Sequence, residues 1–312
     1  MFDRRFLKDA IERSTTTNHL DRRRFLAAAG LTGVSVGAAT LMSPMATALA
    51  EEAAGGAISD EAVLNFALNL EYLEAEFYLH ATRGIGLNPN ATTGVGDRGR
   101  VIGGRKVPFV TTAVRDYAQE IAFDEQNHVY FLRSVLGSVK VARPTIDLKE
   151  AFTAAALAAG LIQPGETFDA FESETNFLLA AYIFEDVGVT AYKGAAPLLV
   201  NKTYLEAAAG LLAVEAYHAS NIRTVMVAQG LQAQSVAISD ARDSLDGPED
   251  KDQGLVFNGK PNIVPTDTNG LAFSRTAGEV LNIVYLNAAS VTSGGFFPDG
   301  VNGEINTSDP ND

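Results

Sequence analysis

The sequence predicts an all-α core, a four-helix bundle with one long crossover, followed by an irregular C-terminal extension. Four long segments carry apolar residues at helical spacing, at about residues 59–82, 109–136, 168–192 and 203–229. About ten residues separate the third segment from the fourth, whereas roughly thirty separate the second from the third. The helices therefore form two pairs joined by a crossover.

The boundaries of these helices follow from capping and helix-breaking residues. Ser59 is placed to cap the first helix, and residues 84–108 are rich in Gly, Asn and Thr, which predicts a long loop. Arg143-Pro144-Thr145 ends the second helix. An Ala-rich stretch at about residues 148–159 predicts a short helix within the crossover.

The pattern changes after the fourth helix. The segment 240–252 is acidic and rich in turn residues, and Thr276 and Glu279 form a capping box for a short helix. We therefore expect a bundle domain at residues 51–230. Residues 231–312 are expected to be a C-terminal extension, mostly loop with one short helix, packed on the bundle or on a neighbouring subunit.

The N-terminal residues have the three parts of a removable export signal. Arg22–Leu26 supplies paired arginines before Phe-Leu, an Ala- and Gly-rich stretch follows to about Met42, and Ala48–Ala50 gives an A-x-A cleavage site. This pattern predicts a twin-arginine type signal peptide at residues 1–50 and export to the periplasm or the extracellular space. A membrane anchor or an amphipathic helix is the alternative. The cleaved chain is expected to have no stable membrane span.

Composition excludes several functional classes. The 312 residues contain no cysteine, which rules out a disulfide scaffold, a thiolate zinc site, an iron–sulfur cluster and a cysteine nucleophile. The formal net charge of −14 argues against nucleic acid as a partner, because binding to phosphates needs clustered Lys and Arg.

Two histidines lie in the motif Glu-x-x-His. Glu125 and His128 form the first instance, and Glu215 and His218 form the second. Residues three apart share one face of a helix, so each motif offers a carboxylate and an imidazole to the same ion. His80, near the end of its helix, is expected to be a solvated surface residue.

The other two long helices also match each other. Glu71 precedes Tyr78 by seven residues, and Glu185 precedes Tyr192 by seven residues, which is two helical turns. The chain thus repeats a Glu–Tyr helix followed by a Glu-x-x-His helix, and each half brings one half of a site. Both tyrosines are expected to pack beside the site and to form a hydrogen bond. Glu74 competes with Glu71 for the inward position, and the Tyr spacing favours Glu71.

Burial of four glutamates near one another favours metal ions. Unpaired buried carboxylates repel one another and are costly to desolvate. Two divalent cations would compensate that charge, and a mixed set of carboxylate and imidazole ligands suits iron or manganese. The pattern therefore predicts two Fe or two Mn ions.

The same residues carry a resemblance to a known family. Two helices that each give a Glu and two that each give Glu-x-x-His resemble the ferritin-like di-metal carboxylate proteins. Residues 64–74 and 212–218 are similar to the ferritin-like domain of desiccation-related proteins, and residues 272–299 are similar to the tails of that group. The resemblance extends over about residues 58–300.

The resemblance implies a metal site with assigned roles. The implied ligands are Glu71, Glu125, His128, Glu185, Glu215 and His218. Of these, Glu125 and Glu215 would be the bridging carboxylates. Asp124 matches a position that orients a ligand histidine on another helix, here His218. The residue before Glu215 is Val214, which departs from that pattern, so the two metal positions need not bind equally well.

Three functions are compatible with such a site. The first is redox chemistry on dioxygen or peroxide in stress protection, like that of a catalase or a peroxidase. The alternative is a non-catalytic stress-associated structural or interaction protein, in which the metal ties the helices together. Iron storage in a cage is the least favoured, because the long extension does not suit a simple cage-forming bundle. The sequence leaves a homo-oligomer open.

Overall fold

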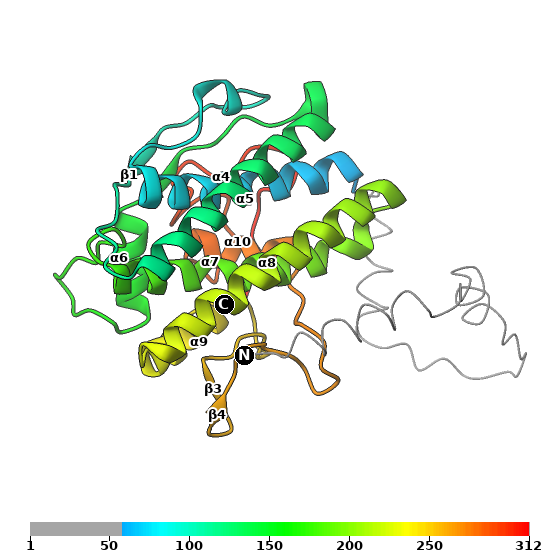
Figure 1. Cartoon of the computed structure of the whole chain (residues 1–312). Coiled ribbons are helices and arrows are strands. Elements are labelled where there is room, and N and C mark those ends of the chain that lie inside the picture. The colour runs from blue at the N-terminus through cyan, green and yellow to red at the C-terminus, as the bar shows by residue number, and fades with distance from the viewer. Residues whose placement is uncertain (1–57, 312) are drawn as a thin grey trace, which may run out of the picture. The chain divides into compact units, whose positions relative to one another are not determined.

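The computed structural model describes residues 58–311, and the signal peptide predicted at residues 1–50 lies outside them. Four long helices form the core (Figure 1): α4 (Asp60–Arg83), α5 (Thr112–Leu136), α7 (Glu174–Ala195) and α8 (Lys202–Ala228). The most extensive helix contacts join α4 to α5 and α7 to α8. The predicted all-α bundle of two helix pairs is therefore confirmed.

Serine caps fix where two of these helices begin. The Ser59 hydroxyl accepts a hydrogen bond from the Ala62 amide at 3.1 Å, as the sequence predicted. Helix α7 begins at Glu174, later than the predicted start near residue 168, because Ser173 is extended and its hydroxyl accepts from the Asn176 amide at 3.1 Å. A serine cap inside a polar stretch was the missed signal.

The crossover is held against the loop that follows α4. It contains η2 (Gly137–Val139), β2 (Ile146–Leu148) and α6 (Glu150–Ala158), and the loop contains η1 (Pro89–Ala91) and β1 (Val101–Gly103). Strands β1 and β2 pair in parallel, with Val101 opposite Ile146. This pairing ties the two longest connections of the bundle together.

The C-terminal region contains two helices where the sequence predicted one. They are α9 (Gln232–Asp243) and α10 (Ala277–Tyr285), with a small antiparallel pair, β3 (Val256–Phe257) and β4 (Lys260–Pro261), between them. The capping box predicted at the start of α10 is present. Helix α9 escaped prediction because three of its four buried residues are polar, so its inward face lacks an apolar stripe.

Buried arginines attach this region to α7 and α8. Arg223 on α8 and Arg242 on α9 donate to the same carboxylate oxygen of Asp186 on α7, at 2.7 and 3.1 Å. Arg242 and Arg275 also donate to Asp252. Removing one partner of such a buried pair is strongly destabilising, so the packing of the C-terminal region on the bundle depends on these residues staying paired.

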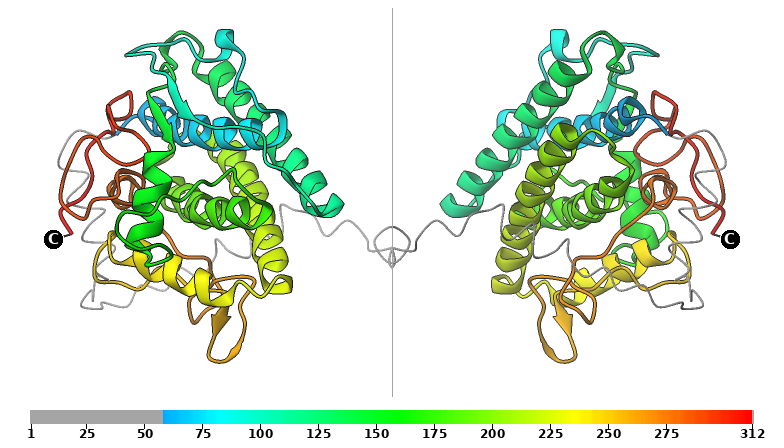
Figure 2. Two further views of the ribbon diagram at one scale, coloured as in Figure 1. Left: turned by 90° about the vertical axis from the view of Figure 1, so that its left-hand side faces the viewer. Right: turned by 90° about the vertical axis from the view of Figure 1, so that its right-hand side faces the viewer.

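An aromatic cluster brings the end of the chain into the core. Phe296 packs against Phe152 of α6 and Phe184 of α7, with ring centroids 5.0 and 4.9 Å apart. Phe77 of α4 lies 5.5 Å from both of these rings. Helix α10 and the tail that follows it lie on the side of the bundle where α4 runs (Figure 2), and Asn69 of α4 donates to the tail at 2.8 Å. The extension therefore completes the core.

A membrane-crossing helix is absent from residues 58–311, since none of their helices combines the necessary length with sufficient apolar character.

Candidate metal centre

The inner faces of the four bundle helices bring all six predicted ligand side chains together. Helix α4 supplies one, α5 two, α7 one and α8 two: Glu71, Glu125, His128, Glu185, Glu215 and His218. None of the six is more than 7% exposed. Helical spacing explains this placement, because residues three apart in each Glu-x-x-His motif face the same side.

One half of the centre surrounds His128. Its Nδ1 atom lies 3.2 Å from Glu71 Oε2, 3.6 Å from Glu125 Oε2 and 3.6 Å from Glu215 Oε1. The four residues can offer one ligand atom each within a space of 4.8 Å. Three helices thus contribute to one set of atoms that could hold a metal ion.

The other half surrounds His218. Its Nδ1 atom lies 3.1 Å from Glu125 Oε1 and 3.6 Å from Glu185 Oε2. Glu185, Glu215 and His218 also offer ligand atoms within 4.8 Å of one another. The two imidazole rings are 6.3 Å apart, so the centre has two neighbouring positions, and Glu215 takes part in both.

The unpartnered atoms of the centre have a regular pattern. Both carboxylate oxygens of Glu125 and both of Glu215 are buried without a hydrogen-bond partner, as is one oxygen each of Glu71 and Glu185. Buried polar atoms without partners are rare and costly. The Nδ1 atoms of both histidines are unpartnered as well. Together, two carboxylates with both oxygens free and two carboxylates with one oxygen free form a donor set that fits a pair of cations.

Two tyrosines occupy the remaining oxygens of the outer carboxylates. Tyr78 on α4 donates to Glu185 Oε1 on α7, and Tyr192 on α7 donates to Glu71 Oε1 on α4. Each tyrosine therefore contacts the glutamate of the opposite half, rather than the one seven residues before it. These hydrogen bonds orient the free oxygen of each carboxylate toward the centre.

The two histidines differ in their support. Asp124 Oδ2 lies 3.2 Å from His218 Nε2, as the family resemblance implied. The counterpart of Asp124 in the second motif is Val214, which has no polar side chain, and no described side chain hydrogen-bonds to His128 Nε2. The surroundings of the two histidines are therefore chemically unequal.

Burial disfavours the ionised form of most carboxylates in the centre. Burial raises the pKa of Glu71 to about 7 and that of Glu185 to about 8, although the nearest histidine lowers each. The pKa of Glu215 lies well above its usual range, because burial and the charge of Glu125 act together. Burial also raises the pKa of Glu125, but the two close imidazoles of His128 and His218 outweigh burial and hold this pKa below its usual range.

The histidines respond to the surrounding negative charge. Burial lowers the pKa of His128, but Glu71 and the other carboxylates outweigh it and raise the value to about 11. In the same way Glu185 and its neighbours raise the pKa of His218 to about 9. Without metal, the histidines of the centre therefore hold protons, because positive charge stabilises the surrounding carboxylates.

Two further residues differ from the expectations of the sequence. Glu74, which competed with Glu71 for the inward position, is itself buried, and its Oε2 atom has no hydrogen-bond partner. His80 was expected to be solvated but is half-buried 3.6 Å from the buried Glu76, and burial lowers its pKa. The expectation for His80 was wrong because the loop after α4 covers the end of that helix: a Cβ added to Gly104 of that loop would lie 2.7 Å from the ring.

Comparison with known proteins gives the family. The family model described as "Ferritin-like domain" matches residues 59–228, which is more than half of the chain. The chain is 32% identical over 272 residues to the desiccation-related protein PCC13-62 of Craterostigma plantagineum, an alignment covering 79% of this chain and 84% of that protein.

A second relative carries an enzyme name. The chain is 27% identical over 274 residues to the ferritin-like catalase Nec2 of Nesocodon mauritianus, covering 79% of this chain and 85% of the relative. No solved structure matches significantly. The bundle, its buried cluster of glutamates and histidines that indicates metal binding, and these comparisons lead to one conclusion: the chain belongs to the ferritin-like family, among its desiccation-related proteins.

Proposed function

We propose that this protein binds a pair of iron or manganese ions and uses them to disproportionate hydrogen peroxide in stress protection. The observation that carries the proposal is the pair of shared carboxylates, Glu125 and Glu215, whose four oxygens are all buried and unpartnered between two histidines. Carboxylate and imidazole donors suit iron and manganese. The name of the relative Nec2, a ferritin-like catalase, supports peroxide as the substrate.

The reaction balances without any other oxidant or reductant. One peroxide molecule gives up two electrons and two protons and becomes dioxygen, and a second takes them up and becomes two molecules of water. The metal pair, when bound, supplies the site that stores two electrons between these half-reactions.

The residues of the chain would hold and insulate that pair. Glu125 and Glu215 would span the two positions, while Glu71 and Glu185 would each bind through the oxygen that its tyrosine leaves free. The surrounding helices exclude bulk water, which limits leakage of reactive oxygen species.

Metal content and peroxide turnover test the proposal together. Wild-type protein purified from its native host should contain about two Fe or Mn per chain and should release dioxygen from peroxide at an oxygen electrode. A Glu125→Ala/His128→Ala variant should lose both properties. Glu174→Gln is the matched control, since Glu174 is also a buried glutamate but lies at the start of α7. It accepts hydrogen bonds from Val110, Thr111 and Gln229 and from none of the candidate ligands. Wild-type protein without metal would refute the proposal.

A structural role for the metal is the second candidate, and the observation that favours it is the way four helices converge on the cluster. The similarity to PCC13-62, whose name records desiccation, is compatible with it. In that case bound metal would raise the melting temperature without peroxide turnover. The same purified samples distinguish the two functions.

We also propose that residues 1–50 direct export by the twin-arginine route. The paired Arg22 and Arg23 carry this proposal. Replacing both by Lys should leave the full-length precursor inside the cell, whereas the wild-type protein should appear shortened after Ala50 in the periplasmic or extracellular fraction.

A further inference from the structure

The two halves of the bundle differ at one position beside the centre. Glu74 follows Glu71 by three residues, and the corresponding residue three after Glu185 is Gly188. A Cβ atom at Gly188 would lie 2.5 Å from Glu215 Oε2 and 3.4 Å from Glu74 Oε1. Gly188 thus leaves space on α7 that two carboxylates from other helices approach. The two repeated halves therefore differ here: the first has a glutamate where the second has a glycine. Glu74 is a fifth glutamate beside the four already described.

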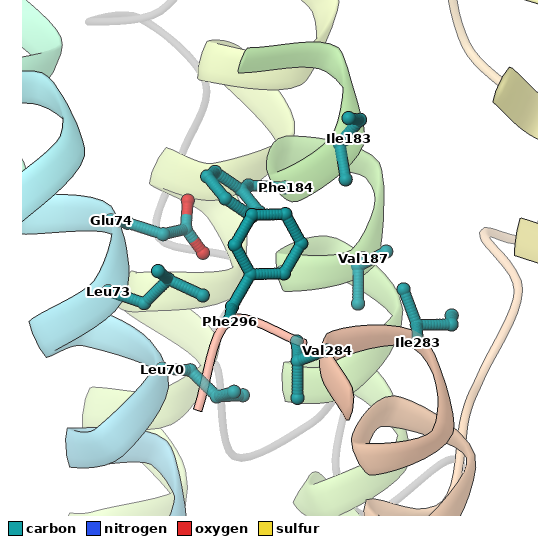
Figure 3. A pocket seen from close by; sticks show the side chains of 10 residues that line it. Leu70, Leu73, Glu74, Ile183, Phe184, Val187, Ile283, Val284 and Phe296 are labelled. Atoms are coloured by element: carbon teal, nitrogen blue, oxygen red, sulfur yellow. The ribbon is translucent and has the colours of Figure 1, made fainter. Parts of the chain in front are cut away.

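Among the described residues, no group donates a hydrogen bond to Glu74 Oε2. Glu74 lines a small pocket beside Gly188 (Figure 3), and the other lining residues are apolar: Leu70, Leu73, Ile183, Phe184, Val187, Ile283, Val284 and Phe296. Its side chain points from α4 into the space between α4 and α7 (Figure 3), and the residue is 7% exposed. Its Oε2 atom has no partner. A buried carboxylate in such a place requires a cation or a proton.

We propose that Glu74 is a seventh protein ligand of the metal pair, bound on the side of the bundle that Gly188 leaves open. The inference rests on the metal centre proposed above and adds a residue to it. Four glutamates neutralise two divalent ions, so a fifth carboxylate brings one more negative charge than that pair needs. One divalent and one trivalent ion would balance five carboxylates. The extra ligand would also make the two metal positions unequal. This adds to the difference between His218, which Asp124 contacts, and His128, for which Val214 provides no polar partner.

The test compares Glu74→Gln with wild type in protein loaded with Co²⁺ after chelation. Gln has the shape of a protonated Glu, so it preserves packing and removes only the charge. We expect one of the two Co²⁺ ions in Glu74→Gln to be released to a chelator at least about tenfold faster than in wild type. The visible absorption of that ion should change with its coordination, and the second ion should be less affected.

A control and a metal-free measurement separate ligation from folding. Glu174→Gln replaces another buried glutamate, remote from the cluster, and should release both ions at the wild-type rate. Without metal, Glu74→Gln should melt at or above the wild-type temperature, because an unpaired buried carboxylate has been removed, yet it should gain less from added Co²⁺.

The outcomes distinguish this inference from the proposed function. If wild-type protein binds two Co²⁺ ions and Glu74→Gln shows the same release rates and absorption, Glu74 is a buried protonated acid and the inference is wrong. If wild-type protein binds no Co²⁺, Fe or Mn, the metal centre itself is refuted, and the inference falls with it.

Discussion

Tyr192 on α7 donates a hydrogen bond to Glu71 on α4, so one half of the bundle orients a carboxylate of the other. Tyr78 and Glu185 repeat the arrangement in the opposite direction. Each hydroxyl occupies one carboxylate oxygen and leaves its neighbour free. Each of these two hydrogen bonds therefore joins a tyrosine of one repeated half to a glutamate of the other.

Removing these hydroxyls should weaken metal binding without unfolding the protein. In Tyr78→Phe and Tyr192→Phe, the outer glutamates lose the partner that orients them, and we expect metal release about tenfold faster than in wild type. Tyr285→Phe is the control, because it loses a hydroxyl that contacts Asn306 and Val301 and none of the six candidate ligands. Equal release rates in all three variants would show that the tyrosines only pack.

Asp124→Ala should affect one metal position more than the other. Asp124 lies 3.2 Å from His218 Nε2, whereas Val214 gives His128 no equivalent. We expect the affinity of the ion beside His218 to fall by about tenfold to a hundredfold. Stepwise titration with Mn²⁺ measures the two sites separately. A uniform loss at both positions would contradict the assigned asymmetry.

Removing a shared carboxylate should have opposite effects with and without metal. Burial and the charge of Glu125 raise the pKa of Glu215 well above its usual range, so Glu215→Gln should stabilise the metal-free fold. A gain of about 1 kcal/mol raises the melting temperature by roughly 2–4 °C in a chain of this size. The metal-dependent gain in melting temperature should disappear. A variant that melts lower in both states would point to a packing role for Glu215.

The metal-free protein should lose stability as the pH rises. The folded pKa values of Glu71 and Glu185 are about 7 and 8, against an ordinary value of 4.5. Above 4.5 the unfolded chain releases these protons first, so rising pH favours unfolding until the folded values are passed. His218 acts in the same direction, because its stabilisation is full below 6.5 and is lost as the pH passes about 9. Glu125, whose pKa is lowered, adds stability above 4.5 that does not change in this window.

Thermal melting in the presence of a chelator, at several pH values from about 5.5 to about 8.5, measures this effect. Metal-loaded protein is the control, since its ligands are deprotonated at all of these values and metal binding strengthens as protons leave. A metal-free melting temperature that rises with pH over this range would mean that the carboxylates do not form a coupled buried cluster.

Phe296→Ala should destabilise the whole bundle. Phe296 is fully buried between Phe152 and Phe184, and replacing a core Phe by Ala costs about 3–5 kcal/mol. Chemical denaturation with a helical circular dichroism signal measures the loss. Phe257→Ala is the matched control, because Phe257 is 47% exposed and should change stability little. A normal unfolding midpoint for Phe296→Ala would mean that the tail is dispensable.

The helical spacing of apolar residues predicted those features of the structure that lie within a single helix. The long amphipathic helices and the inward position of Glu71, Glu125 and Glu215 follow from spacing along the chain. The start of α7 and the existence of α9 did not, since a serine cap and a polar inward face give no apolar signal. Contacts between helices were the least predictable, because spacing alone does not say which half each tyrosine contacts.

Glu74 shows the same limit inside the site. Spacing placed it near the inward face of α4 in competition with Glu71, but both residues turned out to be buried. What admits Glu74 is a glycine on another helix, Gly188, together with the apolar side chains of α10 and the tail. That combination is a property of the packed structure and has no local sequence signal.

The position of Phe296 has a consequence for synthesis. The residue follows all four bundle helices in the sequence, and its ring fills the core between the crossover and α7. Until the segment that contains Phe296 has been synthesised, the space beside Glu74 stays open even if the four helices have associated. A chain terminated before Phe296 would therefore expose an aromatic gap of the kind that chaperones bind.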